Sequence, residues 1–479
     1  MKLNILSLLS FIFFILSCSG KGDTNGNGED VIDKGPEPIS FYPQEGATNV
    51  PAGTITIKLT FDQNISFSST NLSSITLSDA SVLKANVIES EGKYRNLTIY
   101  ASGLIHSKLY RLIIPKGIIK GANGIYNDNI SLSFTTVDAP AITSTLCDKN
   151  SVIKTQQLFK YMVSIYGSKS FSSTMASVNW NNKEAEYVNK ITGKYPAINC
   201  YDFIHIAWSP ANWINYSDLT PIKDWADKGG IISLMWHFNV PASGNTLTDL
   251  NSYTCTPEKT TFRAANIFVE GSWENKFFYS QMDKVCDVLS KMQEAGYVAL
   301  WRPFHEGAGN IYTYTNGKAW FWWGADGGEI YVKIWKAMFD YFQLKGIHNL
   351  IWIWTTQNSG DEAFYPGDNY VDIVGRDIYG FGIDKNIYEY NTISLKYSNK
   401  MVALSECGNY IENGKVTSEM ASISSQWNRG SRWLYFMPWY DYDFNEGKSS
   451  TNIMCYDSFW KDAMQQDFVL TREDVKGKF

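Results

Sequence analysis

The chain has 479 residues, 44% hydrophobic and 19% charged, a globular composition that allows about two to three domains. Its formal net charge of −6, without any basic stripe, argues against a nucleic-acid partner. Aromatic residues reach 15%, with 17 Trp and 29 Tyr. Such an excess indicates either large aromatic cores or exposed rings that stack on a flat ligand.

The first residues form a targeting segment. Residues 3–16 are nearly all apolar but too few to span a bilayer comfortably. This favours a signal peptide, covering residues 1–17, rather than an anchor helix. Leu16-Ser17-Cys18 resembles a bacterial lipobox, so Cys18 is expected to become the lipidated first residue. Ordinary cleavage with loss of Cys18 is the alternative. Residues 18–38 are polar and Gly-rich, a flexible tether to the outer membrane, on its periplasmic or surface face.

The other cysteines and the histidines show no metal-ligand spacing, whether CxxC, HxH or HExxH. Export permits disulfides, but the spacing pairs none of these cysteines, and buried free thiols are equally compatible. The sequence therefore predicts no metal site and no cofactor. The cysteines concerned are Cys147, Cys200, Cys255, Cys286, Cys407 and Cys455.

Residues 39–137 read as short strands separated by turns. Thr54–Phe61 (TITIKLTF) alternates as a half-buried strand does, and Glu45-Gly46 and Asn123-Gly124 are typical turn pairs. We expect a β-sandwich of about 100 residues. The segment resembles the bacterial immunoglobulin-like domains that precede secreted enzymes. A spacer is the favoured role, because a glycan-binding module would be unusual without any tryptophan.

Residues 140–479 alternate helical and apolar stretches, which predicts a (β/α)₈ TIM barrel with enlarged loops. A doubly wound open sheet is the alternative, but no glycine-rich dinucleotide motif opens the region. Helices are expected over Thr155–Tyr166, Phe278–Ala295 and Ile330–Leu344. The eight expected strands are Ser173–Val178, Cys200–Ala207, Ile231–His237, Val298–Phe304, Leu350–Trp354, Val371–Gly375, Met401–Ser405 and Trp433–Pro438.

Polar residues collect after the expected strands, where barrel enzymes carry their active sites. Glu306 follows the fourth strand and Glu406 the seventh, so the two face each other across the barrel mouth. Hydrolysis of a glycosidic bond uses such a carboxyl pair. Glu306, near aromatic rings that would raise its pKa, suits the general acid, and Glu406 suits the nucleophile. Other strand-end residues are Asp202, His205, His237, His305, Gln357, Asn358, Arg376, Asp377, Tyr379, Trp439, Tyr440 and Asp441.

Some neighbouring residues have modest interpretations. Arg302 is expected to pair with a barrel carboxylate rather than bind substrate. Asp202 and Asp377 are candidates for holding other side chains in place. For Trp322 and Trp323, a core position is as good an interpretation as a sugar subsite, and Trp323 is kept as a candidate for substrate binding.

Four ordered motifs, WRPFHE with WFWWG after it, IWIWTTQN, VDIVGRDIYG and LSECG, resemble glycoside hydrolase family 26. That family consists of retaining (β/α)₈ enzymes with catalytic glutamates after strands four and seven, and most members are endo-β-1,4-mannanases. The resemblance implies Glu306 as acid/base and Glu406 as nucleophile. Retaining enzymes hold the two carboxyl groups about 5–5.5 Å apart.

The resemblance also implies roles for the surrounding residues. His237 and His305 would line the −1 subsite, Tyr379 would orient the nucleophile, and Trp320 and Trp439 would stack on sugar rings. Residues 311–319 (IYTYTNGKA) are interposed between HE and WFWWG, where many relatives have almost nothing. We expect this loop near the leaving-group side, where it affects acceptor preference.

Together these observations predict an exported, lipid-anchored, monomeric endo-β-1,4-mannanase acting on mannan, glucomannan or galactomannan without a cofactor. One alternative keeps the fold and mechanism but acts on mixed-linkage β-glucan or β-xylan. The other is a non-catalytic glycan-binding lipoprotein, whose signature would be the loss of one carboxylate. Both carboxylates are present here.

Overall fold

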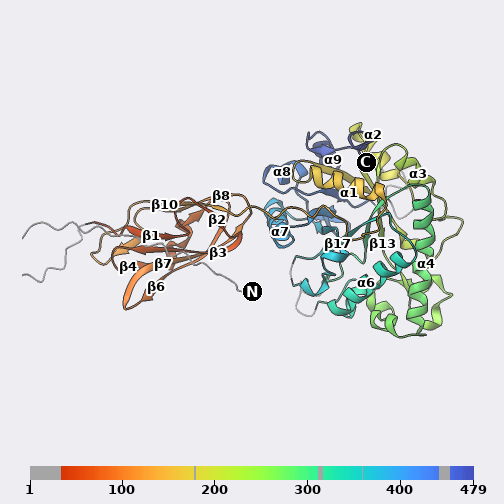
Figure 1. Cartoon of the computed structure of the whole chain (residues 1–479), viewed down its shortest axis with the longest axis horizontal. Helices are drawn as coiled ribbons and strands as arrows, with labels where there is room; N and C mark the ends of the chain where they lie inside the picture. Colours follow the sequence, from red (N-terminus) through yellow and green to blue (C-terminus); the bar gives the residue numbers. More distant parts are fainter. Residues whose placement is uncertain (1–33, 177–179, 311–316, 359, 442–453) are drawn as a thin grey trace, which may run out of the picture.

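The computed structural model describes residues 34–176, 180–310, 317–358, 360–441 and 454–479. An all-β region near the N-terminus is followed by a barrel surrounded by helices (Figure 1). The predicted signal peptide and Cys18 lie outside the described residues, as does most of the tether. No helix within the described ranges is long and apolar enough to cross a membrane.

The all-β region packs two four-stranded sheets face to face, as the alternating strands predicted. Along β3, the buried residues Ile55, Ile57, Leu59 and Phe61 all point to one face. One sheet has the order β1 (Pro38–Tyr42), β3 (Gly53–Phe61), β7 (Lys93–Leu104), β6 (Ser81–Ser90). The other is β2 (Ala47–Val50), β10 (Ile130–Thr136), β8 (Leu109–Ile114), β5 (Thr76–Leu77), and β4 (Ile65–Phe67) pairs with β9 (Ile119–Gly121).

Eight parallel strands form the barrel, and the pairing of the first with the second closes it. This confirms the predicted (β/α)₈ fold. In order around the barrel they are β11 (Ser170–Met175), β12 (Ile198–Asp202), β13 (Ile231–Trp236), β16 (Ala299–Pro303), β17 (Leu350–Thr356), β18 (Ile373–Tyr379), β19 (Met401–Gly408) and β22 (Tyr435–Pro438).

A ninth short strand, β23 (Val469–Leu470), pairs in parallel with the first two residues of β11, Ser170 and Phe171. The remaining short strands form two antiparallel pairs outside the barrel, in the loops that follow its strands. They are β14 (Val240–Pro241) with β15 (Tyr253–Thr254), and β20 (Tyr410–Glu412) with β21 (Lys415–Ser418).

Helices surround the barrel (Figure 1). The longest, α4, begins where the Ser272 hydroxyl accepts a hydrogen bond from the Asn275 amide, and Gly296 follows its end at φ 77°. The helices are α1 (Ile153–Ile165), α2 (Lys183–Thr192), α3 (Thr220–Ala226), α4 (Trp273–Glu294), α5 (Trp322–Ala325), α6 (Gly328–Leu344), α7 (Ile383–Lys396), α8 (Ile423–Asn428), α9 (Asp457–Ala463) and α10 (Arg472–Val475).

Two expected strands end earlier than the sequence predicted. β11 stops at Met175, and residues 177–178 of the expected strand lie outside the described residues. β12 stops at Asp202, because its carboxylate accepts a hydrogen bond from the Ile204 amide and turns the chain into a short 3₁₀ helix. The aromatic excess proves to be largely core, since many tryptophans are fully buried between strands and helices, among them Trp225, Trp301, Trp335, Trp352 and Trp354.

Candidate active site

Glu406 lies near the C-terminal end of β19 with both carboxylate oxygens bound. One accepts a hydrogen bond from the Arg302 guanidinium on β16, and the other accepts one from the Tyr379 hydroxyl on β18 at 2.7 Å. Arg302 also donates to Asp377 at 3.0 Å, and the Ser405 hydroxyl donates to the other oxygen of Asp377 at 2.6 Å. Side chains from β16 and β18 thus fix the orientation of Glu406 on β19, and the carboxylates that Arg302 pairs with include Glu406 itself.

Glu306 sits on a tight turn just after β16. Phe304 and Glu306 have φ angles of 46° and 51°, a left-handed conformation that is uncommon for residues other than glycine. Hydrogen bonds hold the turn: the Tyr331 hydroxyl donates to the Phe304 carbonyl at 2.8 Å, and the Trp323 indole donates to the His305 carbonyl at 2.9 Å. Backbone strain retained in this way is typical of residues placed for function.

The Glu306 carboxyl has a different electrostatic setting from that of Glu406. Burial raises the pKa of Glu306 well above its usual value, and the negative charges of Asp377 and Glu406 raise it further, against the opposing charge of Arg302. Within the described ranges, no side chain or backbone group hydrogen bonds to this carboxyl. Glu306 is therefore suited to carry a proton at neutral pH and to give it to a leaving group.

Two histidines stand beside the carboxyl pair, with ring centroids 4.4 Å apart. The His237 ring bonds to Asp202 at 2.6 Å, and Asp202 also accepts the His237 backbone amide at 3.0 Å. Burial lowers the pKa of His237, but the charge and hydrogen bond of Asp202 more than offset this, so the pKa is raised overall. Asp202 thus holds His237 in place, as expected.

His305 is fully buried beside it and behaves in the opposite way. Burial lowers the pKa of His305 well below its usual value, and the nearby charges of His237 and Arg302 lower it further. Its Nδ1 atom has no hydrogen-bond partner among the described residues. The neutral ring therefore keeps unused hydrogen-bonding capacity beside the carboxyl pair.

Aromatic rings surround this centre to different degrees. The Trp439 ring is half-buried and lies 5.8 Å from His237, and Trp320 is 43% exposed. Both present ring surface on which a sugar could stack. Trp323 does not, because it is fully buried, stacks on Phe321 at 4.3 Å and donates its N–H to the turn below Glu306. The structure therefore corrects the prediction for Trp323, which supports the site from behind.

Phe321 is a site residue that the sequence analysis missed. Its ring is half-buried and lies 5.1 Å from His305 and 5.7 Å from His237. The run of aromatic residues over Trp320–Trp323 was the available signal, but a loop gives no periodicity that separates inward from outward rings. Trp322, like Trp323, is buried, and its indole donates to the Phe238 carbonyl at 2.6 Å.

Other strand-end residues form a separate structural cluster. The Arg376 guanidinium and the Asn358 amide both donate to Glu389 of α7 at 2.9 Å. Gln357 accepts from Arg376 at 3.3 Å. These contacts link the ends of β17 and β18 to α7, and of these residues Arg376 is near enough to the carboxyl pair for its charge to oppose the rise in the pKa of Glu306. In the part of the chain that the structure describes, no group of three or more His, Cys, Asp or Glu could hold a metal ion.

Sequence comparisons match this architecture. Residues 147–474 match the family described as glycosyl hydrolase family 26, and residues 33–136 match a bacterial Ig-like domain. A mannan endo-1,4-beta-mannosidase of Thermothelomyces thermophilus is 29% identical over 70% of this chain, which spans 64% of that relative's length. Mannan endo-1,4-beta-mannosidase B of Piromyces sp. is 26% identical over 97% of this chain and 79% of its own.

Solved structures give the same picture. The family 26 domain of an endo-beta-mannanase/endo-beta-glucanase from Prevotella bryantii is 46% identical, with a TM-score of 0.64 over 70% of this chain and 99% of its own. A beta-mannanase from a symbiotic protist of the termite Reticulitermes speratus, complexed with gluco-manno-oligosaccharide, is 28% identical. Its TM-score is 0.56 over 70% of this chain and 98% of its own.

Proposed function

Since this chain belongs to glycosyl hydrolase family 26 and is a glycoside hydrolase, we propose that it cleaves β-1,4-mannosidic bonds within mannan-type polysaccharides. The observation that carries the proposal is the pair Glu306 and Glu406 at the mouth of the barrel, one raised in pKa and one bound by two donors. The relatives named as mannan endo-1,4-beta-mannosidases support mannan as the substrate and cleavage within the chain.

The chemistry proceeds in two displacements. Glu406 attacks the anomeric carbon while protonated Glu306 gives its proton to the leaving oxygen, so that the glycosidic bond breaks as the glycosyl–enzyme bond forms. Arg302 and Tyr379 hold the two oxygens of Glu406 and direct its attack. Glu306, now ionised, then takes a proton from water, which attacks the same carbon and releases Glu406 with retained configuration.

The residues around the pair bind the sugar. His237, oriented by Asp202, and neutral His305 bind hydroxyls of the −1 sugar, and Trp439 stacks on its ring. Trp320, on the loop that follows Glu306, stacks on a sugar on the leaving-group side. The inserted loop expected there includes residues 311–316, which lie outside the described residues.

A product assay tests this function. The purified enzyme is incubated with mannan, glucomannan, galactomannan, mixed-linkage β-glucan and β-xylan, and the released reducing ends and oligosaccharides are measured. We expect mixed manno-oligosaccharides early in the reaction, and NMR should show the β-anomer first. Activity on mixed-linkage glucan or xylan with none on mannan would contradict mannan as the substrate. Binding of these glycans without any hydrolysis would instead indicate a non-catalytic glycan-binding protein.

The sequence also supports a proposal for location. Lipidated Cys18 would anchor the enzyme as a monomer to the outer membrane, with the immunoglobulin-like region as a spacer. Incorporation of labelled palmitate into the wild-type protein, and its loss in Cys18→Ser together with release into the soluble fraction, is the expected result. Equal solubility of both proteins would count against the anchor.

A further inference from the structure

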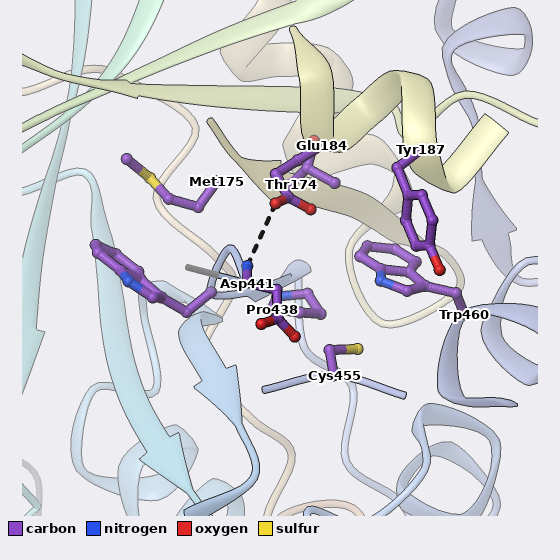
Figure 2. A pocket seen from close by; sticks show the side chains of 9 residues that line it. Thr174, Met175, Glu184, Tyr187, Pro438, Asp441, Cys455 and Trp460 are labelled. Atoms are coloured by element: carbon purple, nitrogen blue, oxygen red, sulfur yellow. Dashed lines mark hydrogen bonds between the residues drawn. The ribbon is translucent and has the colours of Figure 1, made fainter. Parts of the chain in front are cut away.

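A small pocket lies beside Trp439, between the ends of the first and last barrel strands. Thr174 and Met175 of β11 and Glu184 of α2 line one side, and Trp439 and Asp441 after β22 line the other. In Figure 2 the Glu184 carboxyl points toward the Asp441 backbone, joined to it by a dashed hydrogen bond. The mechanism above makes no use of this buried carboxyl group.

Glu184 ties the segment that carries Trp439 to helix α2. Its carboxyl oxygen accepts the Asp441 backbone amide at 3.3 Å, and the two side chains are only 8% and 9% exposed. The Trp439 amide is bonded to the Cys407 carbonyl at 2.9 Å, and the Met454 amide donates to the Asp441 carboxylate at 3.3 Å. Of these three ties on residues 439–441, the one to Glu184 depends on a titratable group outside the segment.

The surroundings of Glu184 disfavour a negative charge on it. Burial raises the pKa of Glu184 to about 8, and the charge of Asp441 adds to this, while the hydrogen bond from the Asp441 amide opposes it. Cys455 faces the same pocket with a thiol whose pKa burial raises, and Tyr187 on α2 donates to Asp457 of α9 at 2.7 Å. No lysine or arginine lines the pocket among its described residues.

We propose that Glu184 is a positioning residue for Trp439, holding the Asp441 amide while it is neutral and releasing the segment when it ionises beside Asp441. The hydrogen bond from the Asp441 amide can form while Glu184 is neutral, because a protonated carboxyl still offers its carbonyl oxygen as an acceptor. In the ionised form the charge lies in a small buried pocket, and this burial is the largest cause that disfavours it, so the segment moves to let water reach the carboxylate. The effect on sugar binding rests on the proposed function, whereas the tie itself does not.

Hydrogen–deuterium exchange of the free enzyme tests the tie without any substrate. Amide protection of residues 439–441 is measured at about pH 6.5 and pH 9 and corrected for the intrinsic exchange rate. We expect wild type to lose protection between the two values, Glu184→Gln to keep it at both, and Glu184→Ala to lack it at both. Glu186→Ala, an exposed glutamate on the same helix turn, serves as the control and should match wild type.

Equal protection of wild type and Glu184→Gln at pH 9 would overturn the proposal, and this comparison needs no alanine variant. The kinetic consequence is a KM for manno-oligosaccharides roughly tenfold higher in Glu184→Ala, equivalent to losing one hydrogen bond in the buried segment, with kcat changed less than about twofold. An unchanged KM would also overturn it. Failure to hydrolyse mannan, with the exchange results as expected, would refute only the proposed substrate.

Discussion

The ends of β16 and β19 carry the same side chain in opposite settings. Glu406 is part of strand β19, next to an irregularity in its pairing with β18, and donors from β16 and β18 bind its carboxylate. Glu306 lies on a left-handed turn, and no described residue hydrogen bonds to its carboxyl. Two hydrogen bonds hold the oxygens of Glu406, whereas burial and neighbouring negative charges raise the pKa of Glu306.

This contrast teaches that the role of a carboxyl group is assigned by what surrounds it. In the proposed mechanism two chemically identical groups act as nucleophile and acid because their environments differ. Arg302 is central to the difference, because it binds Glu406 directly but acts on Glu306 only through its charge. Variants at either strand end should therefore fail in different ways.

The largest expected effect is at the β19 end. Glu406→Ala should lower kcat on mannan by about 10⁴-fold or more, because no other group can form the glycosyl–enzyme bond. Added azide should occupy the vacated space and give a glycosyl azide of inverted, α configuration. Glu412→Ala, an exposed glutamate just beyond the same strand, is the matched control and should retain full activity. Near-normal turnover in Glu406→Ala would remove Glu406 from the nucleophile role.

Glu306→Ala should lower kcat on mannan by roughly 10²- to 10⁴-fold, since proton donation to the leaving oxygen is lost. Aryl glycosides with good leaving groups need less protonation, so their first step should be nearly unaffected. Azide should here give the β-glycosyl azide, because it attacks the glycosyl–enzyme from the face that water uses. The same anomer of azide from both variants would mean that the two roles are not divided as proposed.

The pH profile reports on the same strand end. Because the pKa of Glu306 is raised, its acid form persists to a higher pH than an ordinary carboxyl, and kcat/KM should fall only as pH rises through that value. In Glu306→Ala this alkaline limb should disappear for substrates with good leaving groups. Its persistence in the variant would assign the limb to another group.

Tyr379→Phe sharpens the comparison at the β19 end with a smaller change. Removing the hydroxyl leaves one oxygen of Glu406 without its donor, and a hydrogen bond to a charged group contributes about 1.5–3 kcal/mol. We expect kcat to fall by roughly 10- to 100-fold with little change in melting temperature. Tyr388→Phe, an exposed tyrosine on α7, is the control. Unchanged kcat would show that Arg302 alone suffices to orient Glu406.

The smallest expected effect is at Trp320, beyond the β16 end. A stacking ring contributes about 0.5–1.5 kcal/mol to the free energy of sugar binding. Trp320→Ala should therefore raise KM for long manno-oligosaccharides by roughly 2- to 10-fold. Substrates too short to reach the leaving-group side should be unaffected. An equal effect on short and long substrates would place Trp320 elsewhere in the site.

The sequence predicted the barrel because the hydrophobic pattern marks its alternating strands and helices. It predicted the positions of Glu306 and Glu406 because strand order places the ends of the fourth and seventh strands at the same mouth. It did not predict how Arg302 is shared between Asp377 and Glu406, since that depends on register across three strands. The sequence also did not predict the burial of Trp323, because a loop has no hydrophobic periodicity that separates buried from exposed residues.

The pairing of β23 with β11 has a consequence for how the protein is made. The first barrel strand bonds to the last one and also to Val469 and Leu470, near the end of the chain. Nearby, the Arg472 guanidinium stacks 3.6 Å over the Tyr195 ring next to β12. The catalytic region therefore cannot complete the pairing of its first strand until residues 469–470 have left the ribosome. Synthesis from N- to C-terminus leaves the barrel unfinished until this segment emerges.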